Sequence, residues 1–451
     1  MAEIRPFAAF HYNTERVALK DVLTQPYDKI TPAMEEQYYA ASPYNLIGVE
    51  KGRSFPDDTP RNNVYTRAAA KVEEWIAQKI LVEGPAPAMY VYAQQFLVPG
   101  THARRERTGF IALGRLEDYD AKIVFPHERT LSGPKTDRLE LLRQTRMQTG
   151  QLFLLYDDPA RRIDSLLEET TRRNAPFEMW DEYEVVHRVW PVSDAAFVRR
   201  IEKEMAEKGL VIADGHHRYE TALNYRNERR ARSGKSDAQT AYEFAMMTFV
   251  NAHSKGLTIL PTHRLIRNVT DFDFETFRNA VAPFFDWYAY PFRNADERAA
   301  SYAEFCKDLE SHKHGRRAIG TYAGSGAFYL FLLRQNADLE SLLLDVSEPQ
   351  RGLDVVLLHR LMLEKGLGIT AEALAAEKNV AYEREMAAAI DAVDRQEAQM
   401  ACFLNPVHVE QVIEIAMGGG VLPQKSTDFY PKLLSGIEIY RIEARAGDTL
   451  G

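Results

Sequence analysis

Ala213-Asp214-Gly215-His216-His217-Arg218-Tyr219 is the stretch that decides how this chain is interpreted, because it lies between two segments of opposite character. The compact apolar run 209–213 predicts a buried strand, and the charged segment 219–232 predicts a helix. The amides of a helix's first turn have no partners within the helix, and its dipole adds partial positive charge, so an anion is stabilised there. We therefore expect this stretch to bind a phosphate group.

Four residues of the stretch supply the expected phosphate contacts. Gly215 lets backbone amides approach an anion closely, and Arg218 offers a planar fork of donors that matches phosphate oxygens. His216 and His217 can donate hydrogen bonds, and either can serve as an acid or a base. Asp214 can orient a histidine or hold a magnesium ion. We therefore count Asp214 and His216 among the catalytic candidates.

Two other interpretations of the adjacent histidines stay open at this point. They could form part of a metal site, although neighbouring residues point in different directions and ligands on a helix usually lie three to four positions apart. They could also be buried, hydrogen-bonded side chains with a structural role. Residue chemistry favours phosphate binding over both.

A second group of polar residues precedes the stretch. His127-Glu128-Arg129-Thr130 follow the apolar run Ile123-Val124-Phe125, and Lys135, Asp137 and Arg138 come next. Glu128 could be a general base and His127 a second catalytic group, while Lys135 and Arg138 could neutralise a transferring phosphoryl group. A solvated loop that leads into a helix explains the same spacing, and spacing alone slightly favours it.

Other polar residues beside turns or glycines are also candidates. As possible substrate-binding residues we take Tyr27, Asp28, Asn45, Asn251, His263 and Arg264, and as supporting phosphate contacts Lys425 and Ser426. A helix cap or a loop tether explains the middle group about as well, and a surface turn explains Lys425. A Walker A loop is rejected at Lys425, because Gln424 stands where that motif requires glycine.

Composition excludes several classes of protein. The 451 residues carry a formal net charge of −9, which argues against nucleic acid as the main partner. Two cysteines cannot build a disulfide framework or a cysteine-based zinc site. The first residues lack the layout of a signal peptide, and no apolar run approaches the roughly 20 residues that cross a bilayer. We expect a cytoplasmic protein with a small-molecule substrate and no membrane partner; a homodimer is left open.

The order of the motifs resembles an uncharacterised prokaryotic family, domain of unknown function 1015. Its matching pieces run from residue 5 to residue 436, and their joint occurrence is specific although each alone is weak. They are Arg5-Pro6-Phe7, Pro26-Tyr27-Asp28, Ser42-Pro43-Tyr44-Asn45, His127-Glu128-Arg129-Thr130, Asp137-Arg138, Asp214 to Tyr219, Leu260-Pro261-Thr262-His263-Arg264, Lys425-Ser426-Thr427 and Phe429-Tyr430-Pro431-Lys432.

Asp214-Gly215-His216-His217-Arg218 also resembles the phosphate-binding loop of the ParB/sulfiredoxin superfamily, which includes kinases of free L-serine. This resemblance implies phosphoryl transfer from ATP, ADP or pyrophosphate to the hydroxyl of a small metabolite, with Mg²⁺ as cofactor. Glu128 would accept the hydroxyl proton, and Asp214 or Glu128 would help to hold the metal. The alternatives are a phosphatase or nucleotidase that uses the same pocket, and a ParB-like nucleotide-binding module.

We expect an α/β protein with some α+β elements and a ParB/sulfiredoxin-like core built on a mixed sheet. The predicted domains are a core over residues 1–265 that carries the phosphate site, a smaller α+β unit over 266–345, and a helical segment over 346–451 whose final strand returns to the core.

Overall fold

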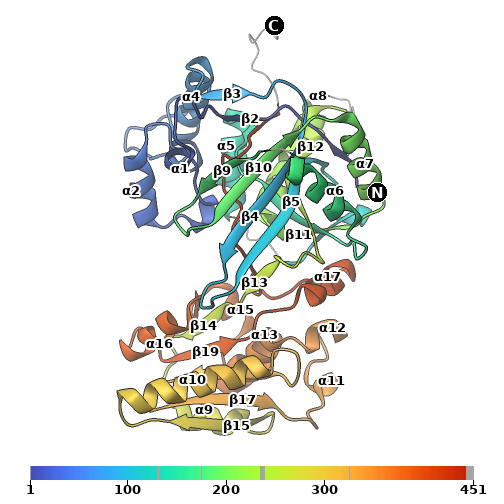
Figure 1. Ribbon diagram of the computed structural model, residues 1–451. Coiled ribbons are helices and arrows are strands. Elements are labelled where there is room, and N and C mark those ends of the chain that lie inside the picture. Colours follow the sequence, from blue (N-terminus) through green and yellow to red (C-terminus); the bar gives the residue numbers. More distant parts are fainter. Residues whose placement is uncertain (1, 129–132, 174, 234–238, 325, 443–451) are drawn as a thin grey trace. The chain divides into compact units, whose positions relative to one another are not determined.

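The computed structural model describes residues 2–128, 133–173, 175–233, 239–324 and 326–442 (Figure 1). The chain forms two compact units. The first comprises residues 1–126, 130–258 and 431–451, and the second comprises 127–129 and 259–430. We describe each unit by itself.

In the described residues, the first unit is built on a nine-stranded mixed sheet in the order β6-β11-β8-β12-β5-β4-β10-β9, with β1 paired to β5. β11 runs parallel to β6, and β12 runs parallel to β8, while the other neighbours are antiparallel. The strands are β1 (Ile4–Arg5), β4 (Met89–Leu97), β5 (Arg104–Arg115), β6 (Val124–Pro126), β8 (Leu152–Tyr156), β9 (Phe177–Trp180), β10 (Val186–Val192), β11 (Leu210–Asp214) and β12 (Phe244–Asn251).

Three helices of the described residues pack against this sheet and complete its hydrophobic core. Buried residues of α6 (Arg162–Arg173), α7 (Ala195–Met205) and α8 (His216–Ser233) share one apolar cluster with the central strands. Two features of the sequence explain why the amphipathic helix α7 forms. Asp194 caps its N-terminus by accepting from the Phe197 amide, and its apolar side chains recur on the buried face.

A second apolar cluster belongs to the N-terminal part of the chain, where Trp75 packs with Tyr12 and Tyr44. The remaining elements of this unit are β2 (Phe10–Tyr12), α1 (Leu19–Val22), η1 (Tyr27–Lys29), α2 (Pro32–Ala41), α3 (Ile47–Glu50), α4 (Val64–Ala77), β3 (Leu81–Glu83), η2 (Tyr119–Ala121), α5 (Gly133–Thr145), β7 (Met147–Gln148), η3 (Ala241–Glu243) and β21 (Tyr440–Arg441). β21 pairs with β7, so the chain returns to this unit near its end.

The described part of the second unit holds a six-stranded antiparallel sheet in the order β15-β17-β16-β19-β14-β18. The strands are β14 (His263–Ile266), β15 (Phe285–Pro291), β16 (Ala318–Tyr322), β17 (Ala327–Leu333), β18 (Val380–Glu383) and β19 (Met400–Leu404). Its core includes α10 (Ala295–Ser311) and α16 (Met386–Asp394). The other elements are β13 (Thr258–Leu260), α9 (Phe274–Val281), α11 (Leu339–Leu342), α12 (Glu348–Arg351), α13 (Asp354–Leu357), η4 (Leu358–Glu364), α14 (Lys365–Leu367), α15 (Ala371–Ala375), α17 (Val409–Met417) and β20 (Asp428–Tyr430).

The expected α/β class with a large mixed sheet is confirmed. The division into units differs from the predicted domains 1–265, 266–345 and 346–451, because β19 lies between β14 and β16 and so joins the third segment to the second. Besides the final strand β21, three strands of the described residues, β18, β19 and β20, lie in the segment predicted to be helical. β19 is a run of five buried residues, and such a run does not distinguish a buried strand from a buried helix by its period.

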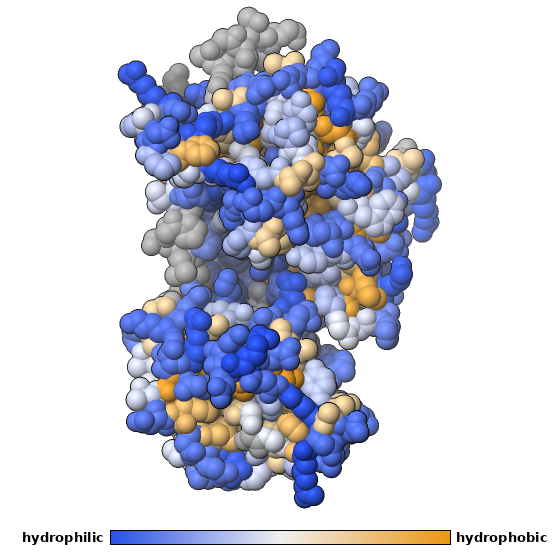
Figure 2. All heavy atoms as spheres, turned by 90° about the vertical axis from the view of Figure 1, so that its left-hand side faces the viewer, coloured by the Kyte–Doolittle hydropathy of each residue, from blue (hydrophilic) through white to orange (hydrophobic). Residues whose placement is uncertain are grey.

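Hydrophilic residues cover most of the face in Figure 2, as expected for a chain with 27% charged residues. Among the described residues, no helix combines the length and the apolar character needed to cross a membrane.

Replacing Ile201 by alanine tests the core of the first unit. Ile201 of α7 is fully buried in the apolar cluster, so Ile201→Ala should lower the free energy of unfolding by about 2–5 kcal/mol in denaturant titrations. Arg200→Ala, at an exposed position of the same helix, should change it by less than about 0.5 kcal/mol. Equal effects of the two substitutions would contradict the packing of α7.

Candidate functional site

The strand-to-helix junction predicted from the sequence is present in the first unit. Asp214 ends β11, Gly215 follows, and α8 begins at His216. Gly215 has a φ of +91°, and a side chain there would meet Leu152 Cδ2 at 3.2 Å and Arg218 Nε at 3.3 Å. The Gly215 amide donates to Asp214 Oδ1 at 2.7 Å. Glycine is therefore required at this turn for both backbone conformation and space.

Three cationic side chains interact electrostatically with the carboxylate of Asp214. Lys432 Nζ donates to Asp214 Oδ2 at 3.0 Å in an ion pair that is largely shielded from solvent. Burial alone would raise the pKa of Asp214, but the charges of Lys432, Arg218 and Lys29 hold it well below its usual range. This end of α8 thus gathers more positive than negative charge around one carboxylate, which is the electrostatic setting that an incoming anion requires.

Lys432 reaches Asp214 because buried groups hold the segment that carries it. Arg107, on β5, donates from Nη2 to the Pro431 carbonyl oxygen at 2.6 Å, and Gln94 Nε2 donates to the Lys432 carbonyl oxygen at 2.8 Å. Arg107 also donates to Gln94 Oε1. Its guanidinium lies over the Phe153 ring at 4.6 Å, and burial lowers its pKa to about 10. These contacts fix the backbone from which the Lys432 side chain extends.

Arg218 lies against two glycines. Its Nη1 donates to the Gln151 carbonyl oxygen at 2.5 Å, and a side chain at Gly150 would come within 3.0 Å of the same nitrogen. Arg218 also lines a cavity of about 70 Å³ together with Tyr27 and Arg138. The cavity has room for water but not for a nucleotide, so a larger ligand would have to contact Arg218 from outside it.

Tyr27 and Arg138 stack in that cavity. The Arg138 guanidinium lies 4.4 Å from the centre of the Tyr27 ring, and it donates to the carboxylate and carbonyl oxygens of Glu50 at 2.9 and 2.8 Å. Thr149 donates to the second carboxylate oxygen of Glu50. The predicted residues Tyr27 and Arg138 therefore lie beside Arg218. Arg138 is also engaged by Glu50, which sequence reasoning did not include.

The histidines of the stretch occupy the first turn of α8. The His216 side chain is buried, and that of His217 is half-buried. Tyr219, in contrast, has a structural role, because its hydroxyl donates to the Glu117 carbonyl oxygen at 2.8 Å and accepts from the Glu117 amide at 3.0 Å.

A second set of predicted residues comes together in the second unit. His127 Nε2 lies 2.7 Å from Thr427 Oγ1, and Thr427 Oγ1 lies 3.4 Å from Glu128 Oε1. Arg264 donates from Nη2 to the Lys425 carbonyl oxygen at 3.1 Å, and Ser426 donates to the Pro423 carbonyl oxygen at 2.5 Å. The motifs around residues 127, 264 and 425, which are far apart in the chain, are thus neighbours in one unit.

Arg264 is the buried cation of this second set of residues. It is 1% exposed, its Nε has no hydrogen-bond partner among the described residues, and burial lowers its pKa to about 10. The neighbouring His263 accepts from the Leu404 amide at 3.3 Å, and burial lowers its pKa to about 3. The Lys425 side chain is exposed.

Two of the residues predicted to bind substrate make hydrogen bonds to backbone groups of the first unit. Asn45 donates to the Asp21 carbonyl oxygen and accepts from the Ile47 amide at the start of α3. Asn251 is fully buried and donates to the Asp158 carbonyl oxygen. In the sheet, Asn251 lies opposite Tyr156 of β8, whereas Asp214 lies opposite Phe153, near the other end of that strand.

Four further residues of the predicted motifs are Asp28, Arg129, Thr130 and Lys135. Asp28 is exposed within η1. The side chain of Lys135 and the residues Arg129 and Thr130 lie outside the described part of the chain.

The residues present do not fit a magnesium ion held by the protein at Asp214. One carboxylate oxygen of Asp214 accepts from the Gly215 amide and the other is paired with Lys432. Within the described residues, no group of three or more histidine, cysteine, aspartate or glutamate side chains is placed to hold a metal. We therefore derive no step from a resident metal at Asp214.

Sequence reasoning missed Lys29 and the role of Lys432. Lys432 belongs to the quoted motif Tyr430-Pro431-Lys432, so its motif was visible, but its pairing with Asp214 joins residues 218 positions apart. Lys29 directly follows the predicted residues Tyr27 and Asp28. Basic residues within or next to the quoted motifs could therefore have indicated both lysines.

Sheet, junction and charges together define an α/β protein with a candidate anion-binding loop at the start of α8. The family model described as "Protein of unknown function (DUF1015)" matches residues 4–356, and the chain belongs to this family. The resemblance seen in the motif order is thereby confirmed. The chain has no significant match among curated proteins.

Solved structures similar to the chain have low identity and low TM-scores. A conserved hypothetical protein from Pyrococcus furiosus is 12% identical, with 70% of this chain and 91% of that chain covered and a TM-score of 0.33. A free serine kinase in complex with AMP is 11% identical, with 70% and 89% covered and a TM-score of 0.32. SbnI from Staphylococcus aureus is 10% identical, with 73% and 87% covered and a TM-score of 0.33. The function is therefore argued from the site itself.

The ion pair at Asp214 makes stability depend on pH. Because the folded-state pKa of Asp214 is depressed, its contribution is present above the unfolded value near 3.8 and is lost as pH falls through the lower folded value. Asp214→Asn should lower the free energy of unfolding at pH 7 by about 1.5–3 kcal/mol. The difference from the unmodified protein should shrink below pH 3.8, measured by denaturant titration at several pH values.

Asp120→Asn is the matched control, because Asp120 is exposed. A difference for Asp214→Asn that stays constant from pH 7 to acid would contradict the pairing with Lys432.

Proposed function

We propose that this protein is a phosphotransferase, which moves a phosphoryl group from a phosphoanhydride donor to the hydroxyl of a small metabolite. The observation that carries the proposal is the set of three cations, Lys29, Arg218 and Lys432, around Asp214 at the N-terminus of α8. Phosphoryl transfer depends on positioning and on neutralising charge more than on covalent chemistry, and such a set supplies both.

In this proposal the donor phosphates bind at the first turn of α8. The Arg218 fork contacts two phosphate oxygens, and the helix dipole adds to the attraction. Lys432 lies between Asp214 and the incoming phosphate. Asp214 keeps the ammonium in place before the donor binds, and Lys432 then neutralises charge that develops on the transferring group. Magnesium enters with the donor as its counterion, because the oxygens of Asp214 are engaged.

The resemblance of Asp214-Gly215-His216-His217-Arg218 to the loop of free-serine kinases supports L-serine as the acceptor to test first. ATP, ADP and pyrophosphate are the donors to test. Glu128 as the proton acceptor stays a prediction. Its carboxylate lies near Thr427 and His127 within its own unit.

The direct experiment is incubation of the protein with each donor and MgCl₂, with and without L-serine. Phosphorus NMR then measures phosphate release and the appearance of a phosphomonoester. Formation of phosphoserine supports the proposal. Phosphate release that no hydroxylated acceptor alters or diverts would identify a hydrolase, and absence of any turnover with all three donors would remove the phosphotransferase assignment.

Variants of the cationic set provide a second test. Lys432→Met should reduce turnover by about 10²–10³-fold, the usual effect of removing one charge-stabilising donor. Arg218→Ala should reduce it at least as much, and should also lower the free energy of unfolding by about 1.5–3 kcal/mol because its bond to Gln151 is lost. Turnover is measured with saturating donor, and stability by denaturant titration.

Arg232→Ala is the matched control, because Arg232 is exposed in the last turn of the same helix. It should leave turnover unchanged. Arg218→Lys separates charge from shape, since it keeps the charge but loses the planar fork. Full turnover of both Lys432→Met and Arg218→Ala would contradict a phosphate site at α8.

A further inference from the structure

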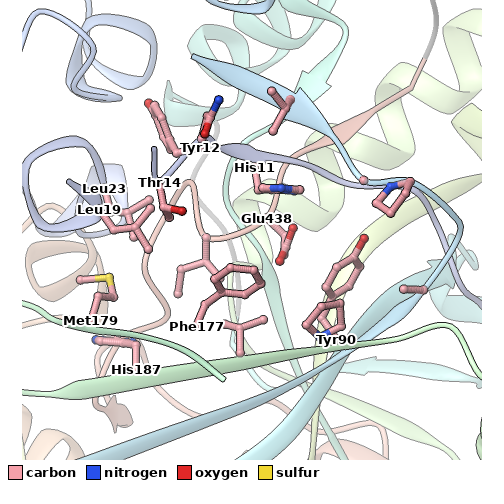
Figure 3. Close-up of a pocket in the computed structure, with 18 of the residues that line it drawn as sticks. His11, Tyr12, Thr14, Leu19, Leu23, Tyr90, Phe177, Met179, His187 and Glu438 are labelled. Atoms are coloured by element: carbon pink, nitrogen blue, oxygen red, sulfur yellow. The ribbon is translucent and has the colours of Figure 1, made fainter. Parts of the chain in front are cut away.

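The first unit contains a large cavity apart from the α8 junction. It has a volume of about 500 Å³, within the range of small-molecule sites (Figure 3). Apolar and aromatic side chains make up most of its wall, including Leu19, Leu23, Tyr90, Phe177 and Met179. Phe177 is 50% exposed, so the wall reaches the protein surface there. The cavity thus offers a mainly apolar space that a ligand can enter from solvent.

Glu438 is the exceptional residue of this wall. It is only 5% exposed, and its Oε2 has no hydrogen-bond partner among the described residues. In Figure 3 its carboxyl group stands among the labelled side chains of the cavity. Burial raises the pKa of Glu438 well above its usual value, and no neighbouring cation opposes this. A buried carboxyl group without a partner is costly, which indicates that a partner is missing.

The charge of the wall indicates the sign of that partner. The described residues that line the cavity include two glutamates, Glu15 and Glu438, but neither lysine nor arginine. Burial lowers the pKa of His11, so this histidine is neutral near pH 7. A carboxylate ligand would meet only like charge here, whereas a cationic ligand would meet opposite charge.

Two polar side chains of the wall, Tyr90 and His187, are already hydrogen-bonded to groups outside it. The Tyr90 hydroxyl donates to the Phe7 carbonyl oxygen at 3.1 Å and accepts from the Ala9 amide at 3.0 Å. The ring nitrogens of His187 lie 2.7 Å from the Tyr92 hydroxyl and 3.2 Å from Asp181 Oδ2. These contacts hold the aromatic wall in place, whereas the buried Oε2 of Glu438 has no hydrogen-bond partner among the described residues and can pair with a ligand.

We propose that this cavity binds a small primary amine with an aromatic or aliphatic body, whose ammonium group pairs with Glu438 while its body packs on the apolar wall. The ammonium donates to Oε2 of Glu438, and the rings of Tyr90 and Phe177 add favourable contact with a cation. The proposal does not depend on the phosphotransferase assignment, because it uses none of the residues at the α8 junction.

Binding should be coupled to release of a proton. The acid form of Glu438 must ionise to pair with an ammonium, so affinity should rise with pH over the range in which an alkylamine stays protonated. The other titratable groups that line the cavity are His11, Tyr12, Glu15, Tyr90 and His187. Glu438→Gln should abolish the pH dependence if Glu438 is its source.

The experiment is isothermal titration calorimetry of the full chain with tryptamine and with tryptophol, its uncharged alcohol counterpart. We expect tryptamine to bind about 10–100-fold more tightly than tryptophol. Glu438→Gln should reduce this preference to less than about threefold. The variant should unfold at the same temperature or higher, because the substitution removes a buried unpaired acid. Glu15→Gln is the matched control, since Glu15 is exposed on the same wall and should retain the preference.

The outcomes separate clearly. Preference for the amine that is lost in Glu438→Gln and kept in Glu15→Gln supports the site. Equal binding of amine and alcohol, or a preference that survives Glu438→Gln, would overturn it. Hexylamine and hexanol provide a second matched pair, and failure of both amines to bind at millimolar concentration would also overturn it.

Discussion

The ion pair between Asp214 and Lys432 is the interaction on which the candidate site depends. A carboxylate at the end of a buried strand needs a counter-charge, and here the counter-charge comes from the far end of the chain. That distant residue is available only because Arg107 and Gln94 hold the backbone at residues 431 and 432. The buried side chains of Arg107 and Gln94 in the sheet thus position the backbone that carries Lys432, and Lys432 in turn pairs with Asp214 at the junction.

Local patterns predicted the parts of this arrangement well. The strand expected at 209–213 is β11, and the helix expected at 219–232 is α8, each within a few residues. Such elements are set by periodicity and by caps, which neighbouring residues encode. The stretch Asp214 to Tyr219 was placed correctly at a strand-to-helix junction for the same reason.

Long-range features were not predictable in this way. The pairing of Lys432 with Asp214 depends on how the whole sheet folds, and no local pattern specifies it. Likewise, His127 and Glu128 belong to the second unit, whereas Asp214 belongs to the first. The sequence alone could not show that the two predicted groups of residues lie in different units. Asn251 was predicted to bind substrate because its side chain is polar. In the structure its Oδ1 accepts from the amides of Asp158 and His253, and its Nδ2 donates to the Asp158 carbonyl oxygen.

The return of the chain at residue 431 has a consequence for protein synthesis. A ribosome completes the whole of the second unit before it adds the segment that finishes the first. A nascent chain that has reached residue 430 therefore holds Asp214 without Lys432, and a cavity without Glu438. Both proposed sites gain these charged residues only after residue 430 and within a few residues of each other, so a chain that stopped there would lack Lys432 at one proposed site and Glu438 at the other.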